Sequence, residues 1–255
     1  MTLRAIIFDV DGTIADTESL HLRAFNRAFA QAGLDWHWDD AAYDDLLVVE
    51  GGLARIRVWV EAHRPRDLAW AENEGMLTAL HAAKSEIYLR ALENEGLPLR
   101  PGIRRLIHEA RSQGIALGVC TTSSRQNFEA LILNAMGFEA LEWFGTVITG
   151  EDVTAHKPDP QGYAAACARL GVAPQDAAAI EDNPRGLAAA RAAGLAVIAC
   201  PGRGTRAADL DGAAIVLSDL GDPGQPFDVL RGDPGRFGHV TLDALRDWTA
   251  CPAVR

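Results

Sequence analysis

Two aspartates, Asp9 and Asp11, belong to the motif Asp-Val-Asp-Gly-Thr near the start of the chain. Residues 4–8 (Arg-Ala-Ile-Ile-Phe), which are apolar from Ala5 on, predict a short buried strand that runs directly into Asp9. In an extended segment residues i and i+2 point the same way, so both carboxylates would face the end of this strand. Two carboxylates at one edge repel each other unless a cation or a proton lies between them. A calcium loop begins similarly, but the apolar Ile14 and Ala15 do not fit its ligand pattern.

A hydroxyl cluster follows the apolar segment 115–120. It contains Thr121 and Thr122, then two serines, and a helix is predicted to start directly behind it. The free amides at a helix N-terminus suit a phosphate, and the hydroxyls would add further donors. Simple capping of the helix accounts for Ser123 or Ser124 alone, and that alternative stays open.

Two later loops add a cation and an acidic pair. Lys157 is followed by Pro-Asp-Pro, and prolines stiffen a loop and start a helix, so the ammonium would project at a fixed place. A solvated surface lysine is the alternative. Glu181 and Asp182 close the apolar segment 177–181. An acidic pair at the end of a buried strand needs a cation or a helix start to neutralise it.

The elements that must position these residues follow a strand–helix rhythm. Apolar runs, each consistent with a strand covered on both faces, alternate with helical patterns along the second part of the chain. We expect strands at 4–8, 115–120, 146–149, 177–181, 195–200 and 213–217, and the last of these would be the final strand. Helices are expected at about 103–113, 160–170, 185–193 and 241–248, and a further helix follows the strand 115–120 and ends at Gly137. The pattern predicts an α/β fold with a Rossmann-like parallel sheet.

A helical stretch interrupts this pattern after the first strand. From Thr17 to about residue 96 the apolar spacing is helical, with no convincing strand. We therefore predict an α/β core formed by residues 1–16 and 89–255 and an inserted helical cap formed by residues 17–88. Open α/β sheets bind ligands at the carboxyl ends of their strands, where all four polar motifs would meet. The Gly-, Pro- and Asp-rich segment after Asp219 is predicted to be a wrapping tail without chemistry.

Together the four motifs form a hard oxygen site for Mg²⁺ beside donors for a phosphoryl group. In their order they resemble the haloacid dehalogenase superfamily, specifically its phosphatases with a helical cap after the first motif. The resemblance covers residues 1 to about 217. It implies that Asp9 is the nucleophile and Asp11 the general acid/base.

The same resemblance assigns the remaining motifs. Thr121 and Lys157 would bind the phosphoryl group, with Thr122 beside them. Asp182 would be the main metal ligand, with Glu181 next to it, and Asp9 and the backbone carbonyl of Asp11 would complete the metal site. Mg²⁺ and the ammonium would offset the repulsion between a carboxylate and a phosphate dianion. Dehalogenases of the superfamily lack the second aspartate of the first motif, which argues against that activity here.

Substrate choice is expected from the cap. Gly51 and Gly52 precede Arg55 at a predicted helix start, where amides and a guanidinium could bind a second anion. Arg55 could equally be solvated, and Lys84 could pair with Glu86 or another surface acid. Two further candidates for substrate binding, Glu18 and His21, lie one helical turn apart just after the first strand.

The cap is similar to that of CbbY-type sugar phosphatases and of β-phosphoglucomutases. Features shared with the CbbY type are the segment 35–39 (Asp-Trp-His-Trp-Asp), the Gly-Gly-x-x-Arg element and the spacing from Lys84 to Tyr88. The resemblance implies a small phosphorylated sugar as substrate, xylulose 1,5-bisphosphate among the candidates. Leu53 stands where we expect a basic residue, which weakens the bisphosphate assignment.

Three other functions are compatible with a phosphate-binding acidic site of this kind. A β-phosphoglucomutase-type mutase would use both aspartates in the same way but return the phosphoryl group to the sugar. A signalling receiver module needs only about 120 residues and no inserted cap. A non-catalytic phosphosugar sensor would not need to keep every catalytic position.

The composition of the chain excludes some classes of binding partner and indicates its cellular compartment. The net charge is −11 with no basic cluster, so nucleic acid is not expected. No apolar run approaches the ~20 residues of a membrane span, and the N-terminus has no signal peptide. Four widely spaced cysteines indicate a reduced, cytoplasmic protein, and we expect a monomer. Of 24 basic residues only Lys84 and Lys157 are lysines. A compact ammonium could serve better than a guanidinium at these two positions, and chance is the alternative.

Overall fold

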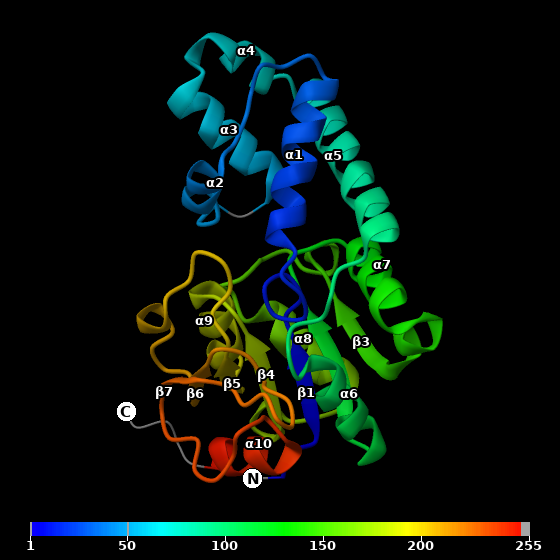
Figure 1. Cartoon of the computed structure of the whole chain (residues 1–255), viewed down its shortest axis with the longest axis vertical. Coiled ribbons are helices and arrows are strands. Elements are labelled where there is room, and N and C mark those ends of the chain that lie inside the picture. Colours follow the sequence, from blue (N-terminus) through cyan, green and yellow to red (C-terminus); the bar gives the residue numbers. More distant parts are fainter. Residues whose placement is uncertain (1, 50, 251–255) are drawn as a thin grey trace. The chain divides into compact units, whose positions relative to one another are not determined.

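The computed structural model describes residues 2–49 and 51–250 (Figure 1). The chain divides into two compact units: Met1–Asp16 with Leu97–Arg255, which we call the core unit, and Thr17–Gly96, which we call the helical unit. The predicted boundary after residue 88 falls inside helix α5 (Glu74–Glu95). No glycine or proline interrupts that helix after Tyr88, and it ends at Gly96, whose φ is +70°.

The core unit contains a seven-stranded sheet in the order β3-β2-β1-β4-β5-β6-β7. All neighbouring strands from β3 to β6 are parallel, which confirms the predicted α/β fold. The strands are β1 (Ala5–Phe8), β2 (Ala116–Cys120), β3 (Phe144–Ile148), β4 (Ala177–Glu181), β5 (Ala196–Ala199), β6 (Ile215–Leu217) and β7 (Val229–Arg231).

Strand β1 lies in the middle of the sheet and sets the place of the site. Its four residues are fully buried, and it pairs with β2 on one side and β4 on the other. Phe8 is in register with Val119 of β2 and Ile180 of β4. The carboxyl ends of these three parallel strands therefore lie at one edge of the sheet, where such sheets bind ligands.

Helices of the core unit connect and cover the strands. Those of eight residues or more are α6 (Ile103–Ser112), α7 (Arg125–Met136), α8 (Gln161–Leu170), α9 (Pro184–Ala192) and α10 (Leu242–Ala250). Helices α8 and α9 pack on the sheet through a buried cluster that includes Ile7, Ala179, Tyr163 and Leu187. The small side chains of β4, three alanines before Ile180, let these helices approach the sheet closely.

The segment after β6 differs from the prediction. We expected residues 213–217 to be the last strand, but β7 follows and pairs antiparallel with β6. Its three residues are all exposed and lie among glycines, prolines and aspartates, so they carry no apolar alternation that could have revealed them.

The helical unit consists of α1 (Glu18–Gln31), α2 (Asp40–Leu46), α3 (Gly52–His63), α4 (Leu68–Ala71) and α5. Its described residues contain no strand, as predicted. Its core is aromatic: the ring of Trp38 is fully buried, 4.6 Å from Phe25 and 5.0 Å from Phe29 between ring centroids. The Asn26 amide donates to the Trp38 carbonyl at 2.7 Å and accepts from its N–H at 2.8 Å, fixing this loop to α1.

Two wider features concern the whole described chain. Cys120, Cys167 and Cys200 are free and buried, and Cys251 lies outside the described residues. Between residues 2 and 250, no helix combines the length and the apolar character that a membrane crossing requires.

Candidate active site

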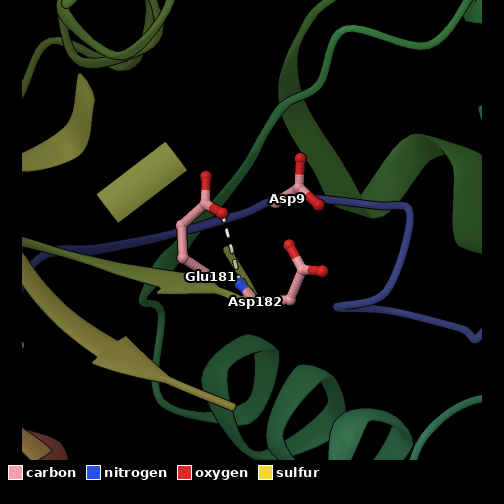
Figure 2. Close-up of side chains that lie close together, drawn as sticks. All are labelled: Asp9, Glu181 and Asp182. Atoms are coloured by element: carbon pink, nitrogen blue, oxygen red, sulfur yellow. Dashed lines mark hydrogen bonds between the residues drawn. The ribbon is translucent and has the colours of Figure 1, made fainter. Parts of the chain in front are cut away.

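Three carboxylates converge at the end of the central strands. Asp9 follows β1, Glu181 ends β4, and Asp182 comes next in the chain. One oxygen from each lies within 4.8 Å of the other two. Figure 2 shows Asp9 and Asp182 facing each other beside Glu181, with the Asp182 N–H donating to Glu181 Oε2 at 3.2 Å. The predicted meeting of separate strand ends therefore occurs.

Lys157 supplies the positive charge of this cluster. Its Nζ donates to Asp9 Oδ1 and to Glu181 Oε1, each at 2.7 Å, and the lysine side chain is only 8% exposed. The Arg185 guanidinium donates to the Lys157 carbonyl and so helps to fix the backbone of the loop that carries this lysine. Because a buried ammonium is costly without such partners, this lysine is not a solvated surface residue.

The pKa values follow from burial and from the crowding of like charges. Burial raises the pKa of Asp9 to about 8, although the Lys157 ammonium acts in the opposite direction. Burial, and then the charges of Asp9 and Glu181, raise the pKa of Asp182 well above its usual range. Burial lowers the pKa of Lys157, but Asp9 and Glu181 outweigh it and the pKa stays well above its ordinary value. One ammonium therefore does not balance the clustered carboxylates.

The backbone around Asp182 fits a site for a divalent cation. A Cβ on Gly12 would lie 2.2 Å from Asp182 Oδ2, and one on Gly202 would lie 2.1 Å from the same atom, so a side chain at either position would displace the Asp182 carboxylate. The Asn183 amide donates to Asp182 Oδ1 at 2.7 Å. Carboxylate oxygens fixed in this way, carrying more negative charge than Lys157 offsets, are ligands that suit Mg²⁺.

The hydroxyl cluster after β2 divides between two roles. Thr121 is buried, and its Oγ1 accepts from the Ser123 N–H at 3.0 Å. Ser124 caps α7 by accepting from the Asn127 N–H at 3.3 Å, so the capping alternative holds for that serine. Thr121 and the exposed Thr122 line the same pocket as Lys157.

Asp11 lies outside the cluster of three carboxylates. Its side chain is half-buried, and its negative charge contributes to raising the Asp9 pKa. In the turn that follows, the Gly12 N–H donates to the Ala15 carbonyl at 2.9 Å. The roles of Asp11 as general acid/base and, through its carbonyl, as a metal ligand remain predictions.

Tyr163 is a member of the site that the motifs did not reveal. Its hydroxyl donates to Glu181 Oε1 at 2.5 Å, and Lys157 Nζ lies 5.2 Å from the centre of its ring. Burial, and then the negative charge of Glu181, raise the pKa of the Tyr163 hydroxyl well above its ordinary value, so it stays a donor. The available signal was a tyrosine on the buried face of α8, since a buried hydroxyl needs a partner.

In the helical unit, Glu18 and Arg55 meet at a tyrosine that we had not singled out. Tyr43 donates to Glu18 Oε2 at 2.6 Å and accepts from Arg55 Nη1 at 3.2 Å, while Arg55 Nε donates to the Val49 carbonyl at 2.9 Å. The Arg55 side chain is only 15% exposed, so the solvated alternative is wrong. Gly51 and Gly52 do begin a helix there, as predicted.

His21 and Lys84 form a second buried pair in the same unit. Lys84 Nζ lies 2.8 Å from His21 Nδ1, and the His21 ring stacks on Tyr88 with centroids 4.2 Å apart. The ammonium also lies 4.7 Å from the ring centre of Phe25. Glu86, the alternative partner, is exposed and pairs with Arg90, whereas Lys84 is buried.

Comparisons with known proteins agree in the kind of enzyme they indicate. The family model for haloacid dehalogenase-like hydrolases matches residues 3–194. The chain is 40% identical to the plasmid-encoded protein CbbY of Cupriavidus necator over 96% of both chains. It is 31% identical to validoxylamine A 7'-phosphate phosphatase of Streptomyces hygroscopicus subsp. limoneus, over 85% of this chain and 94% of that one.

Two similar solved structures contain a bound ligand. A mutant of CbbY from Rhodobacter sphaeroides, in complex with xylulose-(1,5)bisphosphate, superposes with a TM-score of 0.76 at 40% identity, covering 86% of this chain and 95% of that one. Another CbbY structure from the same organism, in complex with phosphate, gives a TM-score of 0.79 at 38% identity and covers 96% of this chain and all of the other.

Proposed function

This chain belongs to the haloacid dehalogenase-like hydrolases, as a phosphoric monoester hydrolase of the CbbY type. From that premise, we propose that it removes a phosphoryl group from a small sugar phosphate and that Asp9 is phosphorylated during the reaction. The observation that carries the proposal is the bond of 2.7 Å from Lys157 to Asp9 within a cluster of three buried carboxylates. A nucleophilic carboxylate needs such a cation to approach a phosphate dianion.

In the first step, an Asp9 carboxylate oxygen attacks phosphorus and the bond to the sugar oxygen breaks. Asp11 donates a proton to the departing alkoxide. In the second step, water attacks phosphorus, Asp11 takes a proton from that water, and the bond to Asp9 breaks. Inorganic phosphate leaves and both aspartates return to their starting states. Throughout, the Lys157 ammonium and the Thr121 hydroxyl bind oxygens of the phosphoryl group.

Asp9, Asp182 and the Asp11 carbonyl would hold Mg²⁺, with Glu181 next to them. When bound, the ion neutralises part of the negative charge on the phosphoryl group and on the carboxylates. Glu181 has a further task, because its Oε1 accepts from both Lys157 and Tyr163. That double contact keeps the ammonium aimed at Asp9.

For the substrate we propose a phosphorylated sugar with a second anionic or strongly polar end, xylulose 1,5-bisphosphate being the leading candidate. Support comes from the CbbY structure that binds this sugar and is 40% identical to the chain. Glu18, His21, Arg55 and Lys84 would contact the sugar. Leu53 offers no charge after the double glycine, so sugar monophosphates belong in the same test.

The test is a phosphate-release screen over sugar mono- and bisphosphates, with and without Mg²⁺, in which Asp9→Asn is the matched control. We expect phosphate release that requires Mg²⁺ and falls by at least about 10⁴-fold in Asp9→Asn, since removing a nucleophile leaves only binding effects. Circular dichroism and thermal unfolding would verify that the variant is folded.

The outcomes separate the rivals. An isomerised sugar phosphate in place of inorganic phosphate would indicate a mutase. Failure to turn over any phosphoester with Mg²⁺ present, while a sugar phosphate still binds, would indicate a sensor. Full residual activity in a folded Asp9→Asn variant would refute Asp9 as the nucleophile.

A further inference from the structure

Arg100 lies in the segment between α5 and α6, and its side chain is only 10% exposed. Its guanidinium donates to four backbone carbonyls: Gly12 and Cys200 (2.9 Å) from Nη1, and Pro201 (3.2 Å) and Ser218 (2.9 Å) from Nη2. These carbonyls belong to three separate loops, after β1, β5 and β6. A single side chain therefore joins the ends of three strands.

Two of these loops, those after β1 and β5, lie in close contact with the Asp182 side chain. Gly12 and Gly202 are the glycines whose Cβ positions would fall within about 2 Å of Asp182 Oδ2. Gly202 also donates its N–H to the Asp182 carbonyl at 3.1 Å. Arg100 binds the Gly12 carbonyl in one loop and the Pro201 carbonyl in the other, so it fixes the separation of the two glycines.

The backbone of the same segment supports the loop that follows Asp11. The Arg100 N–H donates to the Ile14 carbonyl at 2.9 Å, and Leu99 pairs with Ala15 in an antiparallel bridge. The turn is therefore held by the Arg100 side chain at Gly12 and by the backbone at Ile14. It cannot shift without breaking several of these bonds.

Arginine is required for this arrangement. A guanidinium offers five N–H donors in a planar fork, whereas an ammonium offers three donors around one atom and cannot span carbonyls from three loops. We propose that Arg100 is a positioning residue that sets the affinity of the site for its divalent cation, by fixing Gly12 and Gly202 against Asp182 Oδ2. This inference rests on the proposed function, because it assumes the metal site.

Arg105 provides a matched control. It is also partly buried, and it donates to the carbonyls of Val240 (2.6 Å), Gly221 (2.7 Å) and Leu220 (3.3 Å) and to Asp222 Oδ1 (3.2 Å), all in the C-terminal segment. Its other charged neighbour is Glu109 of the same helix, at 3.7 Å. Arg100→Lys and Arg105→Lys therefore remove the same chemistry from two places, of which one touches the loops around Asp182.

The experiment measures Mg²⁺ and Mn²⁺ binding to metal-free protein by calorimetry, without substrate. We expect Arg100→Lys to weaken cation binding by roughly 10- to 100-fold, as is typical when a residue that orients metal ligands is lost. Arg105→Lys should lower the melting temperature but keep the dissociation constant within about twofold of wild type. A folded Arg100→Lys variant with wild-type cation affinity would overturn the inference.

A second measurement covers the case in which Arg100→Lys does not fold. Arg100→Ala would then be prepared with guanidinium ion, which can occupy the position between the carbonyls. Cation affinity that rises with guanidinium concentration supports the inference, and affinity independent of it refutes the inference. Wild-type protein that binds neither cation would overturn the metal site itself, and this inference with it. Wild-type binding with unchanged Arg100→Lys overturns the positioning role alone.

Discussion

The two lysines of this chain are both buried, but their surroundings differ. Lys157 in the core unit donates to two carboxylates, each at 2.7 Å, and those carboxylates come from the ends of two neighbouring strands. Lys84 in the helical unit lies against the His21 ring nitrogen and the aromatic faces of Phe25 and Tyr88, on two packed helices. The first is bound between two carboxylates, whereas the second lies beside an imidazole and two aromatic rings.

From this difference we infer a division of work between the two units. In the core unit, charges are fixed by backbone positions at one sheet edge, which suits a reaction that needs the same geometry for every substrate. In the helical unit, the charged groups lie on helices and contact mainly other side chains, although Arg55 also donates to the Val49 carbonyl. We therefore expect a substitution there to alter local contacts without moving the sheet edge. Reaction chemistry is expected to be sensitive to the first set, and substrate preference to the second.

The largest expected effect comes from Lys157→Met. It would leave Asp9 and Glu181 buried beside each other without their ammonium, and losing one partner of a buried ion pair typically costs about 3–5 kcal/mol. We expect this loss in the free energy of unfolding at pH 7, measured by urea denaturation, together with loss of phosphate release. A variant as stable as wild type would contradict the charge balance described for the site.

The next effect concerns the metal. A cation that binds only the folded state stabilises it by RT ln(1 + [L]/Kd), about 2.7 kcal/mol at a concentration of 100 Kd. We expect Mg²⁺ to raise the melting temperature of wild type, but not of Asp182→Asn. Asp211→Asn is the control, because this exposed carboxylate pairs with Arg231 far along the chain from the motifs. An equal Mg²⁺ shift in all three proteins would place the cation elsewhere.

The core site was largely predictable because sheet topology does the positioning. Once residues 4–8, 115–120 and 177–181 are recognised as parallel strands, Asp9, Thr121 and Asp182 must share an edge. Side chains that act through backbone groups were not predictable. Arg100 binds four carbonyls, which every residue possesses, so no pattern of residue types announces them.

The contacts of the helical unit depended on packing that the sequence does not specify. His21 and Lys84 are 63 residues apart, and helical spacing gives the face of each helix but not which turns meet. Tyr43, which joins Glu18 to Arg55, lies in a short helix that the sequence marked only as another helical segment. Residue types identified the candidates, and the structure alone identified their partners.

Lys84→Met makes the comparison with Lys157→Met direct, because the substitution is the same. An ammonium beside aromatic rings contributes roughly 0.5–2 kcal/mol, so we expect a smaller loss of unfolding free energy than in the core unit. If Lys84 binds the sugar phosphate, KM should rise while kcat changes little, since the core chemistry is intact. Steady-state kinetics would check this, and a fall in kcat with unchanged KM would place Lys84 in the chemistry instead.

The smallest effect is a pH dependence in the helical unit. Burial, and then the charges of Lys84 and His21, lower the pKa of His81 from 6.5 to about 4. The unfolded chain therefore binds a proton more readily, so stability from this group is complete above pH 6.5 and is lost as the pH falls toward 4. Between pH 7 and 5 we expect a loss of about 1 kcal/mol, allowing for the solvent that reaches the ring.

Tryptophan fluorescence measures this loss, because Trp36, Trp38, Trp59 and Trp70 all lie in the helical unit. In His81→Gln, which cannot take up the proton, the unfolding midpoint in urea should change less between pH 7 and 5 than in wild type. Equal changes in the two proteins would assign the pH dependence to other groups. A midpoint that rises on acidification in wild type alone would show that His81 gains a proton more easily when folded, opposite to what its buried position beside Lys84 implies.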